Sequence, residues 1–139
     1  MKIVKKILAG VVSAAVIVSA LAVPTAADLT NTPKTVTKSG QDVIGNKTIR
    51  YGGDLTATKT YARASVSCTT NASLYVCATT YVPFDEKSLL IVDEEKDAIS
   101  GKSLTVTASN INLNSVYDIT DAEGQYRIGA SISFNLELS

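Results

Sequence analysis

Two cysteines and two groups of carboxylates are the side chains of this chain whose type and spacing could support chemistry. Cys68 and Cys77 are the only thiols and stand nine positions apart. In an oxidising compartment this pair predicts a disulfide, with two buried free thiols as the alternative. A redox-active pair is disfavoured, because the Cys-x-x-Cys spacing that lowers a thiol pKa is absent. A hairpin would place the cysteines opposite each other, whereas a core shared by Val66 and Val76 would turn them to different faces.

The denser acidic group is the segment 93–97, in which Asp93, Glu95 and Asp97 are weak candidates for metal ligands. Carboxylates on a loop can bind calcium, which takes several oxygen ligands. The EF-hand spacing is absent, because an alanine and a leucine occupy the positions of that motif's glycine and bidentate glutamate. We therefore expect a solvated acidic loop over residues 93–101, with no metal and no other cofactor.

Asp118, Asp121 and Glu123 form a second, weaker acidic group, for which a solvated loop is again expected. Paired carboxylates could hydrolyse a glycosidic bond, but that reaction needs a cleft between them. The sequence has no His and no Trp, so the usual general base and the commonest sugar-stacking ring are both missing. We therefore expect no catalytic residues and no enzymatic activity.

The start of the chain has the order of a secretory signal peptide. Three lysines lie within the first six residues, an apolar run covers residues 7–23, and small residues occupy 25–27. We expect a signal peptide over residues 1–27, cleaved after Ala27, with cleavage after Ala22 or an uncleaved membrane anchor as alternatives. The expected location is extracellular or associated with the cell envelope, without stable membrane insertion after cleavage.

Without its first 27 residues the 139-residue chain keeps 112 residues, enough for one domain with one core. Three of the 13 basic residues and none of the 13 acidic residues lie in the leader, so the remainder carries a net charge of −3. A nucleic-acid partner would need a basic face, so we expect no such partner. Ser and Thr supply 27 of the 112 residues. Threonine-rich, alternating sequence predicts β-strands, and therefore an all-β domain.

The predicted domain organisation has three parts: the signal peptide, a flexible N-terminal lead over 28–40 and a single β-domain over 41–139. A short edge strand over 35–37 is the alternative within the lead. A two-residue turn at Gly45 and Asn46 predicts a hairpin near the start of the domain. About seven or eight short strands, each with one apolar face, favour an antiparallel sandwich of two sheets, immunoglobulin-like or similar.

The clearest predicted strand covers residues 126–138, in which even-numbered residues are apolar and odd-numbered residues are mostly polar. A second alternating segment, 111–119, predicts its partner in an antiparallel hairpin with a loop over 120–125. In that register Ile111 stands opposite Phe134, so Phe134 is predicted to be a core residue.

Export combined with the lack of catalytic side chains favours a secreted, non-catalytic protein that acts by binding, in adhesion, envelope association or self-assembly. The expected partner is an extracellular or envelope protein, a glycan, or a second copy of the chain. The alternatives are an antibacterial or toxin-like protein and a small inhibitor of an extracellular enzyme. The net charge argues against a membrane-active toxin, which would be cationic, and the loop 93–101 is the one long loop that an inhibitor could present.

Overall fold

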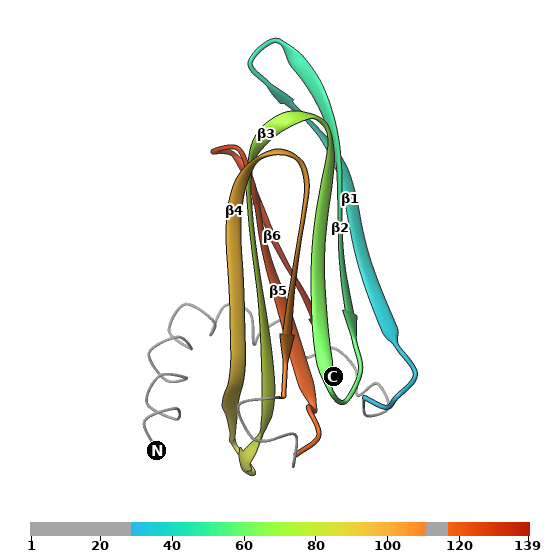
Figure 1. Ribbon diagram of the computed structural model, residues 1–139. Helices are drawn as coiled ribbons and strands as arrows, with labels where there is room; N and C mark the ends of the chain where they lie inside the picture. Colours follow the sequence, from blue (N-terminus) through green and yellow to red (C-terminus); the bar gives the residue numbers. More distant parts are fainter. Residues whose placement is uncertain (1–28, 111–116) are drawn as a thin grey trace.

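Strands make up the regular structure of the residues that the computed structural model describes, 29–110 and 117–139 (Figure 1). No helix is found in these two ranges, so the predicted all-β class is confirmed. The strands are β1 (Lys34–Ile44), β2 (Lys47–Ala57), β3 (Tyr61–Asp85), β4 (Ser88–Ser109), β5 (Asp121–Ile128) and β6 (Ile132–Leu138).

The longest strand, β3, connects the whole sheet. The sheet is antiparallel, with the order β1-β2-β3-β5-β6 and with β4 also paired to β3. The first part of β3, residues 62–68, pairs with β2, and a later part, residues 74–81, pairs with β5. Because β4 pairs with both parts, β2 and β5 follow each other along the opposite edge of β3.

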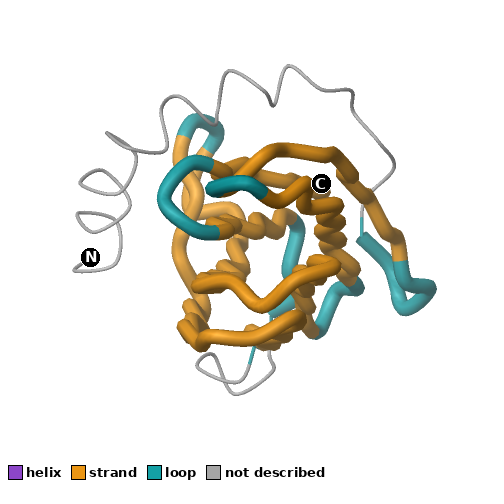
Figure 2. Tube along the Cα trace, turned by 90° about the horizontal axis from the view of Figure 1, so that it is seen from above, coloured by secondary structure: helices purple, strands orange, loops and turns teal. Residues whose placement is uncertain are grey.

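The ribbon of β3 and β4 turns back on itself near its middle, as the upper part of Figure 1 shows. The pairing of the two strands is interrupted there by a register shift between Ser67 and Ala72. An irregularity of this kind bends a strand pair and increases its twist. The two halves of the sheet consequently face each other, and the end-on view in Figure 2 shows the strands around a common centre. The result is a nearly closed barrel.

Even-numbered side chains of β3 point into the barrel on both sides of the bend. This follows the period of two that a strand imposes on its side chains. The inner row meets apolar side chains from β2, β5 and β6, and together they form the core. The core members of this row are Ala62, Ala64, Val66, Cys68, Leu74, Val76 and Ala78.

Aromatic rings fill the inside of the barrel where β2, β5 and β6 meet. Phe134 stacks on Tyr126 with ring centroids 4.7 Å apart and on Tyr51 with centroids 5.8 Å apart. The Phe134 ring lies over Gly53, where an added Cβ would come within 2.6 Å of it. The Tyr126 hydroxyl donates to the carbonyl oxygen of Asp54 at 2.6 Å. Stacked rings contribute about 0.5–1.5 kcal/mol beyond the area they bury, so this cluster ties the C-terminal strands to β2.

The hairpin of β1 and β2 confirms the predicted turn. Gly45 and Asn46 are the two residues between the strands, and Gly45 has a φ of 65°, a conformation that glycine adopts at little cost. β1 begins at Lys34, however, within the segment 28–40 that was predicted to be a flexible lead. Since this edge strand carries mostly polar side chains, the sequence indicated at most a short strand over 35–37 and not its full length.

The C-terminal sequence forms a hairpin and not the single strand predicted over 126–138. β5 ends at Ile128, a loop of residues 129–131 follows, and Ile132 begins β6 directly opposite Ile128. Gly129 supplies a positive φ of 60° within this loop. Because Ile128 and Ile132 are four positions apart, the inward alternation passes through the loop unchanged. The sequence pattern of the hairpin is therefore the same as that of one long strand.

The predicted pairing of this strand with residues 111–119 is also wrong, because the chain reverses at Gly129 and β5 pairs with β6. Tyr126 pairs with Phe134 and not with Ile119, and most of the predicted loop before Tyr126 belongs to β5. Ile111, predicted to face Phe134, lies outside the described residues. The core position predicted for Phe134 is nevertheless confirmed, since its side chain is buried.

One continuous sheet takes the place of the two separate sheets expected for a sandwich. β3 and β4 are 25 and 22 residues long, and both are much longer than the short strands that the sequence predicted. Because these two strands continue through the bend, backbone pairing passes from one half of the sheet to the other without a boundary. The predicted number of strands was correspondingly too high for the described part of the chain.

We predict that Phe134→Ala destabilises the protein by about 3–5 kcal/mol, because the ring is buried and stacked on two tyrosines. Denaturant unfolding of the purified protein measures the loss. Ser133→Ala is the matched control, since Ser133 is exposed on the other face of β6, and it should change stability by less than about 0.5 kcal/mol. Similar losses in both variants would contradict this placement of β6.

Candidate functional site

The two cysteines are free and buried, which contradicts the predicted disulfide. Both belong to β3, and their odd separation turns their side chains to opposite faces of the strand. Cys68 belongs to the core together with Val66 and Val76, whereas Cys77 does not. Burial, with a smaller contribution from the charge of Glu94, raises the pKa of the Cys77 thiol. A thiol held in its neutral form is a weak nucleophile, so Cys77 is not set up for catalysis.

The acidic segment 93–97 lies within strand β4 and not in the predicted loop. Asp93, Glu95 and Asp97 project from one face of the strand, where alternate residues are about 6.7 Å apart. A straight row of this kind does not surround an ion. Among the described residues, no group of three or more acidic, histidine or cysteine side chains is arranged to hold a metal ion.

Asp93 instead helps to close the barrel. Its Oδ2 accepts a hydrogen bond from the backbone nitrogen of Ser109 at 2.9 Å. The hydroxyl of Thr80, which is fully buried, donates to the carbonyl oxygen of Ser109 at 2.9 Å. The first bond connects the early part of β4 to its last residue, and the second connects β3 to the same residue; strand pairing supplies neither link, because Ser109 pairs with Tyr61. Asp93 therefore has a structural role.

Residues 94–100 form an exposed edge of the sheet. Every residue of this stretch is exposed, and within the described chain the stretch pairs only with β3. An unpaired strand edge is a template for pairing with another chain, and charged side chains on an edge oppose such pairing. We infer that the acidic residues here keep two copies from joining through this edge.

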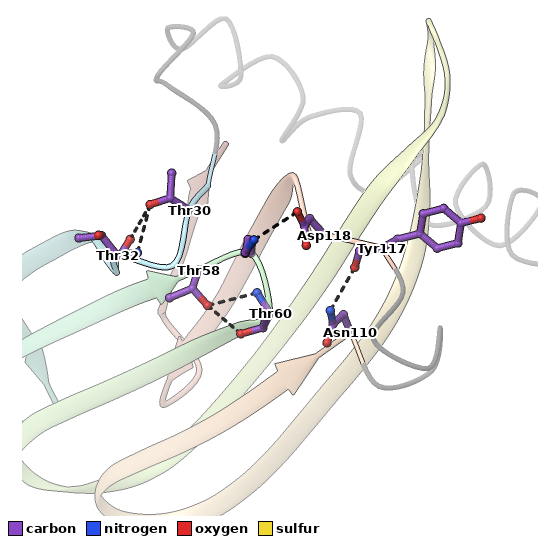
Figure 3. Close-up of polar contacts among 8 residues, drawn as sticks. Thr30, Thr32, Thr58, Thr60, Asn110, Tyr117 and Asp118 are labelled. Atoms are coloured by element: carbon purple, nitrogen blue, oxygen red, sulfur yellow. Dashed lines mark hydrogen bonds and ion pairs between the residues drawn. The ribbon is translucent and has the colours of Figure 1, made fainter.

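Polar contacts close the end of the barrel where β2 joins β3 and where β4 leads toward β5 (Figure 3). Lys59 Nζ lies 3.7 Å from Asp118 Oδ2, and the side-chain amide of Asn110 donates to the carbonyl oxygen of Tyr117 at 3.1 Å. Asp118 thus pairs with a lysine of another loop. The other two members of its predicted acidic group lie on β5 and not on a loop.

Glu123 is a buried carboxylate on β5, with an exposed fraction of 4%. Its Oε2 accepts a hydrogen bond from the Tyr81 hydroxyl at 3.0 Å, and its Oε1 accepts one from the Gln125 side-chain amide at 2.8 Å. Both donors are neutral, so they satisfy the oxygens without neutralising the charge. Burial, followed by the charge of Glu123, raises the pKa of Tyr81 and keeps its hydroxyl protonated as a donor.

Glu137, which was not predicted as a site residue from the sequence, stands directly opposite Glu123 on β6. Both carboxyl oxygens of Glu137 are buried and have no hydrogen-bond partner in the described structure. Burial, followed by the charges of Glu123 and Asp121, raises the pKa of Glu137 to about 7. The alternating sequence held no signal for this pair, since only the loop at Gly129 brings the two glutamates together.

A second surface feature covers the outside of β1, β2, the first part of β3 and the last part of β4. The strand register aligns twelve outward positions in three rows across these four strands, and nine of the twelve residues carry a hydroxyl group. We refer to these twelve residues as the hydroxyl face. Its rows are Thr35, Thr56, Arg63 and Thr107; Thr37, Asp54, Ser65 and Thr105; and Ser39, Gly52, Ser67 and Ser103.

The hydroxyl face is regular in two directions. Neighbouring strands lie about 4.8 Å apart, and alternate residues along each strand lie about 6.7 Å apart. Hydroxyl–hydroxyl hydrogen bonds connect Thr35 to Thr56 at 2.8 Å and Ser65 to Thr105 at 2.9 Å. Because threonine is stiff at χ1, these bonds hold the exposed hydroxyl groups of Thr35 and Thr105 in defined positions, and Thr56 is the buried partner of Thr35.

The comparisons with known proteins add no relative to this description. No protein-family model matches the chain, and no curated protein is similar enough to indicate a relationship. Within 29–110 and 117–139, no helix is long and apolar enough to cross a membrane. The function is therefore argued from the surface of the protein itself.

We predict that calcium does not stabilise the protein, because Asp93 is bonded to Ser109 and because Glu95 and Asp97 project into solvent from the exposed edge. Thermal melts in calcium and in chelator should coincide. A site with calcium at 100 times its dissociation constant would add about 2.7 kcal/mol and raise the melting temperature. A calcium-dependent rise that disappears in Asp97→Asn would restore these residues as metal ligands.

Proposed function

We propose that the chain is an exported protein that acts by binding and not by catalysis, and that its hydroxyl face attaches it to a polysaccharide of the cell envelope. Export is supported by the order of basic, apolar and small residues over 1–27, a segment outside the described residues. A non-catalytic role is supported by the lack of histidine in the sequence and by the structural contacts of Asp93 and Glu123. We further propose that the two facing halves of the sheet correspond to the two layers of the predicted sandwich, with β3 and β4 continuing from one half to the other.

The regular hydroxyl face is the observation that carries this proposal. Each Ser or Thr hydroxyl both donates and accepts hydrogen bonds, as do the hydroxyls of a polysaccharide chain. Serine and threonine side chains are short, so binding immobilises few rotatable bonds and the entropic cost of association is small. A polymer that repeats its hydroxyl groups along its length could form many weak contacts with three parallel rows at once.

Other classes of partner fit this face less well. Protein interfaces depend on buried aromatic or apolar anchors, but the exposed large apolar residues of the described chain, Val43, Phe84, Ile99 and Tyr117, are not members of the face. A nucleic acid would require a basic surface. Asp54 and Arg63 are the two charged members of the face and have opposite signs, which suits a ligand without net charge.

We predict that replacing both Ser67 and Ser103 by arginine weakens binding to purified cell-wall polysaccharide by at least about tenfold, or about 1.4 kcal/mol. These serines are exposed neighbours in one row, so two long charged side chains there would block contact without entering the core. Co-sedimentation of the full chain with polysaccharide from the producing cells measures the effect.

The matched control is Ser133→Arg, because Ser133 is exposed on a strand outside the hydroxyl face. This variant should sediment with the polysaccharide as the unsubstituted protein does. Equal binding by the double variant would contradict the hydroxyl face as the contact surface. Sedimentation with envelope protein alone would contradict the choice of a polysaccharide.

The export part of the proposal predicts that the mature protein begins at Asp28. N-terminal sequencing of protein recovered outside the producing cells tests this. A full-length product retained in the membrane would show that the apolar run 7–23 is an anchor, and would remove the proposed location while leaving the binding measurement intact.

A further inference from the structure

The paired strands β5 and β6 carry two buried acids, and neither forms an ion pair within residues 29–110 and 117–139. Glu123 and Glu137 stand directly opposite each other, and side chains so placed have Cβ atoms about 4.5–5.5 Å apart. Both oxygens of Glu123 accept hydrogen bonds from Tyr81 and Gln125, whereas both oxygens of Glu137 are buried without a donor. An ionised carboxylate in that setting costs more free energy than a protonated carboxyl, because an unpaired buried charge is costlier than an unpaired neutral polar group.

Two acids of the neighbouring strand β5 increase this cost, and the nearby cations are placed over aromatic rings. On β5, Glu123 and Asp121 both disfavour the ionised form of Glu137. Arg127, at the other end of β5, lies over the Tyr75 ring of β3. Its Cζ is 4.8 Å from the centroid of that ring. On β1, Lys38 Nζ lies 5.5 Å from the centroid of the Phe134 ring, on the inner side of β6. On β3, Tyr81 brings no charge to the pair: its neutral hydroxyl donates a hydrogen bond to Glu123.

We propose that the Glu123–Glu137 pair makes the attachment of strand β6 depend on pH: β6 stays on β5 while Glu137 carries a proton and is released when Glu137 ionises. In the acid form, the Glu137 O–H, with its proton taken from solvent, can donate to the Glu123 carboxylate, which has lone pairs left to accept it. In the ionised form, two negative charges face each other across the strand pair. The proposal is independent of polysaccharide binding.

Release of β6 would have two structural consequences. Phe134 would leave its stack with Tyr126 and Tyr51, opening the aromatic part of the core. The edge of β5 would also lose its partner and become available to another strand. The pair thus places a pH-dependent switch at the strand that completes the barrel.

The direction of the pH effect follows from the two states of Glu137. In the folded protein its pKa is raised from an ordinary value of 4.5 to about 7, so between these values the folded chain binds more protons than the unfolded chain. Stability is therefore greatest at the acidic end of this range and is lost as the pH rises through about 7. This is opposite to the effect of a carboxylate whose pKa is depressed by a salt bridge.

Thermal unfolding of the full chain between pH 5 and pH 8 tests the proposal. The melting temperature of the unsubstituted protein should fall as the pH rises. Glu137→Gln keeps the size of the side chain and removes its titration, so its melting temperature should vary less over this range and exceed that of the unsubstituted protein at pH 8. Glu95→Gln, on the exposed edge of β4, is the matched control and should retain the original pH dependence.

Amide hydrogen exchange then shows whether the effect is local to β6. The exchange rate of Phe134 in β6 is divided by that of Val76 in β3, measured in the same sample, so the intrinsic effect of pH cancels. This ratio should rise by about tenfold between pH 5 and pH 8 in the unsubstituted protein and stay constant in Glu137→Gln. A constant ratio in the unsubstituted protein would overturn strand release, and an unchanged melting profile in Glu137→Gln would overturn the role of Glu137.

Discussion

Strand β3 pairs along one edge with β2 and then with β5, so the bend between these two parts determines where the other strands lie. An unbent strand of this length would produce a flat, open sheet with one apolar face exposed to water. Bending the ribbon of β3 and β4 near Ser67 and Ala72 turns the apolar face inward, where one half covers the other. The even-numbered row of β3 supplies core residues to both halves, and burial of this surface is the main force that favours the bend.

Where strand pairing does not close the barrel, side chains do so. Thr80 and Asp93 bind the two backbone polar groups of Ser109, and Lys59 pairs with Asp118 at the same end of the fold. Individual hydrogen bonds of this kind contribute about 0.5–1.5 kcal/mol, less than the aromatic cluster around Phe134. Their main effect is geometric, since they satisfy strand ends that would otherwise lack partners.

The fold class and much of the core could be predicted from the sequence, because alternation reports which side chains are buried. The turn at Gly45 and Asn46 could be predicted because its chemistry is local. The hairpin at Gly129 could not, since Ile128 and Ile132 share a face and alternation therefore does not record the reversal. For the same reason the pairing of Glu123 with Glu137 could not be predicted: it depends on the position of the turn at Gly129, which alternation does not record.

The predictions of a disulfide and of an acidic loop were wrong because both assumed short strands. In the structure one long strand, β3, contains both cysteines, and another, β4, contains the acidic segment. Cys68 and Cys77 belong to one continuous strand whose inward row stays even-numbered on both sides of the bend, so they lie on opposite faces. The hydroxyl face had a signal in the high Ser and Thr content of the chain, but composition does not show that these residues align in rows. That alignment requires the pairing of four strands.

The order of the strands along the chain has a consequence for synthesis. β1 to β4 each pair with the strand next to them in sequence, and β5 pairs with β6, so most of the sheet needs only short-range pairing. The pairing of β3 with β5 is the long-range step, and such steps are slow because a long loop must close. As the ribosome adds residues from the N-terminus, the second part of β3 therefore keeps an open edge until the last strands have emerged. A chain that stops early would retain that edge, which marks it for capture by chaperones or for aggregation.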